Sequence, residues 1–368
     1  MELTKKILFI LHIPPPVHGS SIVGSQIVNS SLIRSNFEID YVNLSTSNSI
    51  AEIGGWNLKK TTQYFKILYS IIIRVIKNNY DLIYLAPTVS SKGFYKDFLV
   101  VLLLKIFNKK IVYHLHNKGV SKNNYFINKL LYKFFFKNVD IILLSRLLYE
   151  DISAYVFENR IYICPNGIEF IPELDKKLNR KLKNKNLTIL FLSNLIESKG
   201  YLVLLDACKI LNDNGLNFKC LFVGGEGDLT SSQFSDLIKS YGLQDKVFYL
   251  GKKYGEEKHN IFLNADIFAF PTFYENETFG LVNIEAMQYG LPVITTSEGG
   301  IPDIIQDKKT GYIIKKRDSV ELAEKLTLLL KNDNLRIKFG QKGRERFLNK
   351  YRLEIFEKKL IKILNELS

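Results

Sequence analysis

Short runs of aliphatic and aromatic residues recur along the whole chain, and longer stretches of helical character separate them. In the first half these runs cover residues 6–13, 81–86, 110–116, 140–145 and 160–164, with helical patterns that include 20–35 and 59–78. Runs that are short and apolar throughout are typical of strands buried on both faces. The alternation therefore predicts an α/β fold with a parallel sheet covered by helices.

The second half repeats this architecture. Its predicted strands are 187–193, 218–223, 247–250, 267–271, 292–296 and 311–314, with helices beginning near Tyr201, Ser231, Glu256, Leu281, Pro302 and Ser319. A length of 368 residues suits two domains. We predict an N-terminal, acceptor-side Rossmann-like domain in 1–172, a lysine-rich linker in 173–186 and a second Rossmann-like domain in 187–345. A C-terminal helix in 346–368 could pack back across both.

Positive charge is concentrated in one segment of the chain. Between Lys59 and Lys137 there are 15 Lys or Arg residues and two acids, Asp81 and Asp97, within a total net charge of +14. Such a field indicates an anionic partner, which could be a membrane surface, a nucleic acid or a phosphorylated substrate. The apolar stretches 67–76, 94–107 and 125–136 are explained mostly as buried helices with lysine-rich outer faces. We attribute the excess charge to docking on an anionic membrane that presents a lipid-linked acceptor.

Other composition signals place the chain in a reducing compartment. The three cysteines are far apart and form no C-x-x-C pair, which argues against disulfides and zinc. The apolar run at 7–11 is broken by His12 and three prolines, so a first strand explains it better than a signal peptide. Since no 18 apolar residues occur in a row, we predict a cytoplasmic protein, peripheral on the inner face of the cell membrane.

The most informative chemistry lies between Glu277 and Glu285. Ligands bind parallel sheets at the carboxyl ends of their strands, and here Gly280 forms a turn before a helix that starts near Leu281. The backbone N–H groups of such a first turn suit a diphosphate. Glu277 precedes the helix and Glu285 lies just over one turn inside it, so the two acids flank the anion site. Taken alone, this spacing is also typical of an ordinary helix start with exposed acids.

The surrounding residues are more specific. Pro271-Thr-Phe-Tyr-Glu-Asn-Glu-Thr-Phe-Gly, Glu-Ala-Met, Gly-Leu-Pro-Val-Ile and Glu298-Gly-Gly-Ile-Pro-Asp303 follow one another within residues 271–303. This segment resembles glycosyltransferase family four, the "glycosyl transferases group 1" type, which has the GT-B fold of two Rossmann-like domains facing a cleft. The match is strong in the second domain and looser in the first. The resemblance implies retaining transfer of a sugar from a nucleotide-diphosphate donor.

The resemblance also implies roles for individual residues. Glu277 contacts the sugar hydroxyls, Glu285 binds the ribose, and the phosphates rest on backbone amides; the donor-binding residues of this turn are Thr278, Phe279, Gly280, Leu281 and Val282. In the first domain, Gly19 approaches the donor phosphates at the start of a helix that Ser20 or Ser21 would cap.

Three further segments complete the predicted donor site. Lys199, which follows a strand, can neutralise a diphosphate. The family normally has an arginine where Asn194 stands, so one cation is missing and another basic residue would have to compensate. Gly225 lies in a glycine-rich loop that lets the backbone approach a ligand, and Lys252 would border the base.

Two histidines end a strand of the first domain on the same face, His114 and His116. The two imidazoles could form a metal pair, but no acid or cysteine ligand is suggested nearby. The resemblance matches His116 to a histidine that positions the reacting sugar, with His114 in support. We therefore expect His116 and Glu277 to be catalytic. Because no D-x-D sequence occurs, we expect metal-independent transfer without a cofactor. The resemblance implies that the transfer is a same-face displacement.

Three other functions remain open at this point. A nucleotide-sugar epimerase, or another GT-B enzyme such as a phosphorylase, would share the fold. A nucleic-acid-binding protein is suggested by charge alone, without a recognition motif, and we expect no nucleic-acid partner. A catalytically inactive scaffold is suggested by the missing arginine. The expected role is surface polysaccharide biosynthesis, by analogy with the family.

Overall fold

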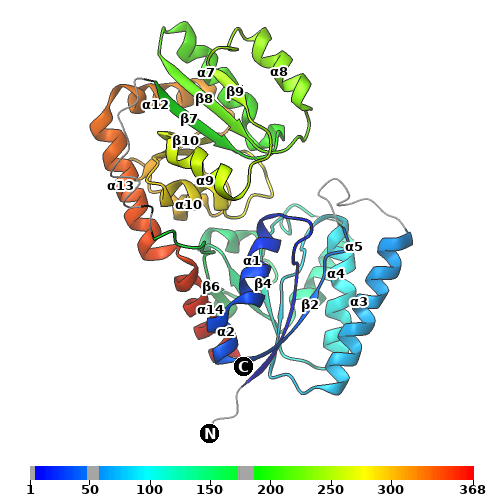
Figure 1. The fold of residues 1–368 in the computed structure, drawn as a ribbon. Coiled ribbons are helices and arrows are strands. Elements are labelled where there is room, and N and C mark those ends of the chain that lie inside the picture. Colours follow the sequence, from blue (N-terminus) through cyan, green and yellow to red (C-terminus); the bar gives the residue numbers. More distant parts are fainter. Residues whose placement is uncertain (1–4, 48–57, 124, 173, 175–185) are drawn as a thin grey trace. The chain divides into compact units, whose positions relative to one another are not determined.

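The computed structural model describes residues 5–47, 58–123, 125–172, 174 and 186–368. The chain divides into two compact units, one of residues 1–166 with 354–368 and the other of residues 167–353 (Figure 1). The predicted linker, 173–186, lies almost wholly outside the described residues. Each unit contains one six-stranded sheet in which every strand pair is parallel.

The first sheet has the strand order β2-β1-β3-β4-β5-β6. Its strands are β1 (Lys6–Leu11), β2 (Glu38–Asn43), β3 (Leu82–Leu85), β4 (Ile111–Leu115), β5 (Asp140–Leu143) and β6 (Ile161–Ile163). The central strands β3 and β4 are buried at every position. This follows from their uninterrupted apolar sequence, because helices cover both faces of a parallel sheet.

Helices α1 (Gly19–Asn29), α2 (Ser31–Asn36), α3 (Leu58–Lys77), α4 (Ser91–Ile106), α5 (Phe126–Phe136) and most of α14 (Leu353–Leu367) belong to this unit, with the short 3-10 helices η2 (Arg146–Asp151) and η3 (Glu158–Arg160). The connections from β2 through α3, α4 and α5 to β5 all run in one direction across the sheet. Right-handed crossovers therefore place these three helices on the same face, where α3 contacts α4 and α4 contacts α5 (Figure 1).

The second sheet has the order β12-β11-β10-β7-β8-β9. Its strands are β7 (Leu187–Leu192), β8 (Phe218–Val223), β9 (Val247–Tyr249), β10 (Ile267–Phe270), β11 (Val293–Thr296) and β12 (Gly311–Ile314). Its helices are η4 (Glu197–Lys199), α7 (Tyr201–Asp213), α8 (Ser231–Ser240), α9 (Gly255–Asn264), α10 (Leu281–Gln288), α11 (Ile301–Ile304), α12 (Ser319–Lys331) and α13 (Asp333–Lys350). This is the strand order of a dinucleotide-binding Rossmann sheet.

The predicted helices at 20–35 and 346–368 each contain a break. Ser30 is extended, and its hydroxyl oxygen accepts a hydrogen bond from the backbone N–H of Ile33 at 3.0 Å, so it caps α2 and separates it from α1. Near the C-terminus the break falls at Tyr351 and Arg352, between α13 and α14. Helix α13 belongs to the second unit, whereas residues 354–368 of α14 belong to the first.

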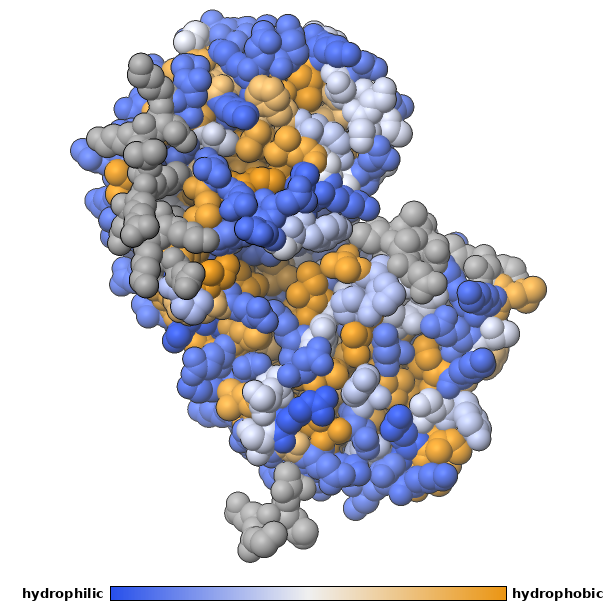
Figure 2. Space-filling model, in the orientation of Figure 1, coloured by the Kyte–Doolittle hydropathy of each residue, from blue (hydrophilic) through white to orange (hydrophobic). Residues whose placement is uncertain are grey.

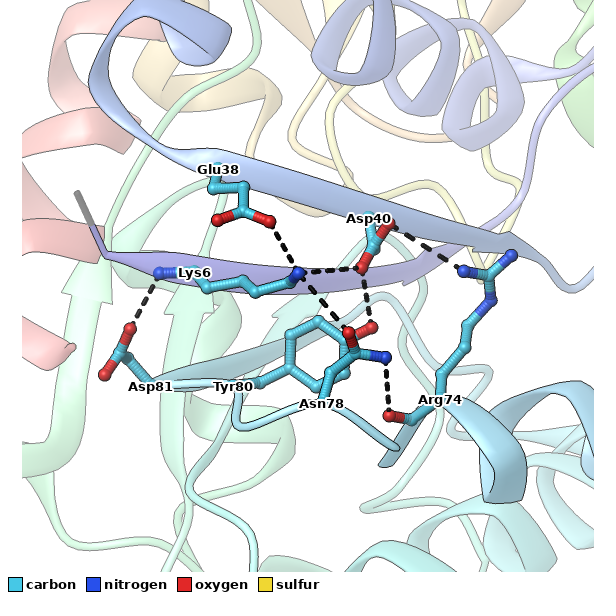
Figure 3. A network of polar contacts seen from close by, with 7 residues as sticks. All are labelled: Lys6, Glu38, Asp40, Arg74, Asn78, Tyr80 and Asp81. Atoms are coloured by element: carbon cyan, nitrogen blue, oxygen red, sulfur yellow. Dashed lines mark hydrogen bonds and ion pairs between the residues drawn. The ribbon is translucent and has the colours of Figure 1, made fainter. Parts of the chain in front are cut away.

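A polar network ties the amino ends of β1, β2 and β3 together (Figure 3). The ammonium of Lys6 lies 2.5 Å from Glu38 and 3.7 Å from Asp40, and the hydroxyl of Tyr80 donates to Asp40 at 2.7 Å. The carboxylate of Asp81 accepts the backbone N–H of Lys6 at 2.7 Å. Hydrogen bonding to Glu38 raises the pKa of Lys6. The network therefore fixes strand register at the end of the sheet opposite to the strand carboxyl ends.

No helix among the described residues has the length and apolar character needed to cross a membrane.

Candidate active site

The strand order of the second sheet indicates where the candidate site of the second unit lies. The order reverses between β7 and β10, which are neighbours in the sheet but are separated in the chain by β8 and β9. Loops leaving the carboxyl ends of these two strands diverge to opposite sides, and the gap between them is where Rossmann sheets bind their ligands. The loop after β7 carries Asn194 and Lys199, and the loop after β10 carries Glu277.

Backbone hydrogen bonds hold the loops at this edge together. The amide of Leu195 donates to the carbonyl of Gly225 in the loop after β8, at 2.8 Å. The amide of Phe273, in the loop after β10, donates to the carbonyl of Ser198 at 2.7 Å. Gly200 completes this junction with a φ of +92°, and a Cβ there would lie 2.3 Å from the carbonyl oxygen of Pro271. The three loops therefore form one connected edge.

Lys199 and Glu277 meet across this edge. The Lys199 ammonium lies 2.7 Å from a carboxylate oxygen of Glu277, and the two side chains are 17% and 13% exposed. The ammonium also lies 4.2 Å from the ring centroid of Tyr274, within cation–π range. The sequence assigned these residues separately to the phosphate and to the sugar, and the structure brings them together. A partly buried pair of this kind presents one cation and one acceptor side by side.

Helix α10 begins beside this pair. It starts at Leu281, as predicted, and its N-cap is Gly280, which has a φ of +70° and no side chain with which to cap the first turn. The backbone N–H groups of a first turn have no partner within the helix. Those of Leu281 and Val282 are therefore of the type that binds an anion. Phe279 is buried, so its side chain belongs to the core and its predicted role in donor binding would have to rest on its backbone.

A glycine supports this turn from the next loop. Gly299 follows β11 with a φ of +53°, and a Cβ on it would lie 2.1 Å from the carbonyl oxygen of Glu277. The amide of Gly300 donates to the carbonyl of Thr278 at 2.8 Å. The Glu298-Gly-Gly sequence therefore positions the backbone that carries Glu277.

Glu285 is engaged by a residue that the sequence analysis did not single out. The ammonium of Lys258, in α9, lies 2.7 Å from one Glu285 oxygen and donates to the other at 2.9 Å. Both side chains are partly exposed, at 29% and 22%. Lys258 was missed because it lies on a charged helix surface, where lysines are common. It fixes the carboxylate that the family resemblance assigns to the ribose.

A second group of predicted residues lies in the loops after β7, β8 and β9, and it consists of Asn194, Gly225 and Lys252. The carboxamide oxygen of Asn194 accepts the backbone N–H of Gly225 at 2.9 Å. A Cβ on Gly225 would lie 2.3 Å from Cε and 3.3 Å from Nζ of Lys252. A lysine ammonium is therefore present beside the position where the family usually has an arginine.

In the first unit, His18 shapes the loop after β1. His18 is the N-cap of α1. Its side-chain Nδ1 accepts a hydrogen bond from the backbone N–H of Ser21 at 3.4 Å, and the backbone N–H of His18 donates to the Ser21 hydroxyl at 3.0 Å. The expected cap at Ser20 or Ser21 is therefore wrong, because the imidazole reaches the helix from one residue before it starts. Gly19 is the first residue of α1 and is exposed.

His116 lies among other imidazoles at the carboxyl end of β4. Burial, followed by the proximity of His12 and His18, lowers its pKa to about 3. Burial likewise lowers the pKa of His12 to about 4. His12 was not expected to belong to the site, although it directly follows the first strand. The cluster presents neutral imidazoles at neutral pH.

His114 has a structural environment. It is fully buried, and its Nδ1 forms a 2.6 Å hydrogen bond with the hydroxyl of Tyr84. Its ring centroid lies 4.2 Å from that of His116. The predicted role of His114, which is to support His116, would therefore act through the packing of the two rings. In the described part of the chain, no three His, Cys, Asp or Glu side chains are grouped closely enough to hold a metal.

Comparison with known proteins gives the family context. Residues 173–346 match the family model of glycosyl transferases group 1. The capsular polysaccharide biosynthesis glycosyltransferase CapM of Staphylococcus aureus is 32% identical over 254 residues, which cover 66% of this chain and 65% of CapM. The match thus spans just under two thirds of that relative's own length.

Solved structures agree over nearly the whole chain. A glycosyltransferase from Rickettsia africae superimposes with a TM-score of 0.77 at 21% identity, covering 99% of this chain and 98% of that one. The Anabaena protein HepE, solved in complex with UDP, gives 0.75 at 17% identity and covers 99% of this chain and 100% of HepE. These likenesses confirm the GT-B class of two Rossmann-like parallel-sheet units. Residues 173–346 of this chain are thus similar in sequence to the glycosyl transferases group 1 family, and the whole chain shares its fold with these solved structures.

Proposed function

We propose that this protein is a retaining glycosyltransferase that moves a sugar from a nucleotide-diphosphate donor to a saccharide acceptor, in surface polysaccharide biosynthesis. One observation carries the proposal: the Lys199–Glu277 pair lies at the strand-order reversal of a Rossmann sheet, beside the start of α10, whose N-cap is a glycine. The UDP complex of HepE and the capsular role in the name of CapM support the donor class and the pathway.

Charge separation at the diphosphate is the demanding part of such a transfer. Lys199 and the first-turn amides of α10 would stabilise negative charge as the sugar leaves, and they need no metal to do so. Glu277 would accept hydrogen bonds from sugar hydroxyls and orient the ring. Donor binding must then share or replace the present contact between Lys199 and Glu277. We propose same-face displacement, with His116 as a neutral positioning group from the first unit.

Replacing Glu277 by Gln tests the assignment. The exchange keeps the shape, removes the charge and leaves the amide a poorer acceptor, so we expect turnover of the nucleotide sugar to fall about 100-fold or more, as for the loss of one charge-stabilising group. Glu275→Gln is the matched control, because Glu275 is an exposed acid two residues away. Equal turnover in the Glu277 variant and the wild type would remove this residue from the site.

Metal independence is tested by chelation. Transfer should continue at an unchanged rate after dialysis against EDTA, because Lys199 and the helix start supply the positive field. A rate that collapses on chelation and returns with Mg²⁺ or Mn²⁺ would overturn this part of the proposal. Analysis of the anomeric product by NMR tests retention in the same assay.

We propose further that the acceptor is lipid-linked and that the protein works at the cytoplasmic face of the cell membrane. The charge of residues 59–137 supports this, since the segment contains 15 basic residues and only two acids. Anionic lipid headgroups attract such segments.

A further inference from the structure

The exposed apolar side chains of the protein are unevenly distributed. Of the 22 large apolar residues that are exposed in the described structure, 13 lie between Leu58 and Phe134, and four lie in the second unit. Figure 2 shows hydrophobic residues at the surface of the first unit, interspersed with hydrophilic ones. Isolated exposed apolar residues are ordinary, but a concentration on neighbouring elements marks an interaction surface.

Helix α3 carries these residues in one line. Leu58, Phe65, Tyr69 and Ile76 are exposed by 73%, 64%, 66% and 61%. Their spacings of seven, four and seven residues bring all four within an arc of about 40° around an α-helix. The buried residues Ile67, Ile71 and Val75 lie on the opposite side. The helix thus has two apolar faces, of which one packs on the sheet and the other points outward.

The two neighbouring helices repeat this arrangement. Tyr95, Leu99 and Ile106 are exposed on α4 at spacings of four and seven residues, and Phe126, Ile127, Leu130 and Phe134 are exposed on α5. Together with the line on α3 they form what we call the apolar face. The expected lysine-rich outer faces of these helices therefore also carry exposed apolar side chains. The apolar stretches exceed what the sheet can bury, and the surplus points to solvent.

Internal bonds keep the three helices in one layer. The Tyr64 hydroxyl of α3 donates to the carbonyl of Lys96 in α4 at 2.5 Å. The ammonium of Lys105, at the end of α4, donates to the carbonyls of Phe134 and Lys137 at 2.5 and 2.8 Å. Burial lowers the pKa of Lys105 to about 8. The apolar face is therefore part of a connected layer and does not depend on a single helix.

Lysines border the apolar face, and the acids of the segment do not. Exposed lysines on these helices include Lys59, Lys66 and Lys77 of α3 and Lys129 and Lys133 of α5. Asp97 is fully buried, where it accepts the backbone N–H of Thr88 at 2.7 Å. Asp81 belongs to the network at the amino end of the sheet (Figure 3). Neither acid neutralises the lysines around the apolar face.

We propose that the apolar face inserts into the interface of an anionic lipid bilayer. Aromatic and aliphatic side chains bordered by lysines match a surface with anionic headgroups above an apolar interior. The inference names the side chains through which the protein would contact the membrane of the proposed function. It adds that apolar insertion, as well as charge, holds the protein on the bilayer. It rests on the proposed function for its biological setting, although lipid binding itself is measured without donor or acceptor.

Vesicle sedimentation tests the contribution of insertion. The full-length protein is mixed with vesicles of phosphatidylglycerol and phosphatidylcholine at 0.05 and 0.5 M NaCl. A face held by charge alone would release at high salt, whereas we expect a measurable bound fraction to remain. The triple variant Phe65→Ser, Tyr69→Ser, Ile76→Ser should lose that remainder and bind at least tenfold more weakly at low salt. The control Val320→Ser, Leu328→Ser, Ile337→Ser removes exposed apolar residues of the second unit and should bind as wild type.

A polarity-sensitive fluorophore at one position gives a second measurement that needs no loss of function. The three native cysteines are buried, so a cysteine introduced by Tyr69→Cys can be labelled selectively. Emission of nitrobenzoxadiazole at this position should shift to shorter wavelength on anionic vesicles, and the same label at Leu328→Cys should not shift. Absence of a shift at Tyr69 with sedimenting protein would show contact through another surface and overturn the proposal.

A partner of another kind is detected without lipid. Sedimentation velocity that shows a dimer in the wild type and a monomer in the triple variant would assign the apolar face to self-association. Donor binding, followed as thermal stabilisation by nucleotide sugars, reports on the second unit in every variant. A triple variant that binds donor but not vesicles therefore separates this inference from the proposed transferase activity.

Discussion

If the proposed function holds, single residues in the loops near β7 decide how the second unit binds a diphosphate. Lys252 lies where it can supply the positive charge that Asn194 lacks. We expect Lys252→Ala to raise KM for the nucleotide sugar about tenfold, because a hydrogen bond to a charged group contributes about 1.5–3 kcal/mol. Lys253→Ala is the control, since Lys253 is paired with Glu257 at 2.6 Å in α9. Equal effects of the two substitutions would contradict the assignment.

Also at the residue scale, the buried imidazoles make stability depend on pH. Burial lowers the pKa of His116 to about 3 and that of His12 to about 4, from 6.5 in the unfolded chain. The unfolded state therefore binds more protons as the pH falls below about 6.5, and folding stability decreases until the folded pKa values are reached. Thermal melts between pH 7.5 and 4.5 should show a falling melting temperature. His116→Gln combined with His12→Gln should flatten that decline.

The sequence predicts the anchors of the donor site better than their partners. Lys199 and Glu277 follow strands within recognisable patterns, so each can be assigned before their contact is known. Lys258 and His12 have no such pattern, because their relevance depends on which helix or loop lies beside them. His114 shows the opposite case: alternation places it beside His116, but only the structure shows the hydroxyl of Tyr84 that satisfies it.

At the scale of elements, the junction between β7 and α7 depends on a glycine. Gly200→Ala would combine a left-handed φ of +92° with a Cβ 2.3 Å from the backbone of Pro271. Gly215→Ala has a comparable φ of +68° and nothing within 4 Å, so it measures the conformational strain alone. We expect about 1 kcal/mol of destabilisation at Gly215 and about 3 kcal/mol at Gly200. Urea unfolding compares the two, and similar values would show that the loop moves freely.

Elements with a buried core are those that the sequence predicts well. All of the strands except β2 coincide with short apolar runs in the sequence. Strand β2 was missed because it lies at the sheet edge, where most of its residues are at least partly exposed and its apolar signal is weak. The outward line of α3 was misjudged for a related reason. An apolar helix pattern shows that residues are available for burial, but it does not show how many of them the sheet can cover.

At the scale of the whole molecule, the chain returns to its first unit at the end. Residues 354–368 belong to the first unit, and α14 buries Phe356, Leu360 and Leu364. Ending the chain after Lys350 should therefore unfold the N-terminal unit, although the deletion is more than 180 residues from Asn166 in sequence. Hydrogen–deuterium exchange should show loss of protection in β1 to β6 and persistence in β7 to β12. Uniform loss in both sheets would contradict the division.

The late return of residues 354–368 has a consequence for biosynthesis. On the ribosome, the second unit has all of its sequence available before the last residues of the first unit have been translated. The first unit then lacks only residues 354–368, so the position of α14 stays empty while nearly two hundred further residues are synthesised. The part made first is thus completed last, so nascent chains of this protein should engage chaperones until residues 354–368 have been synthesised.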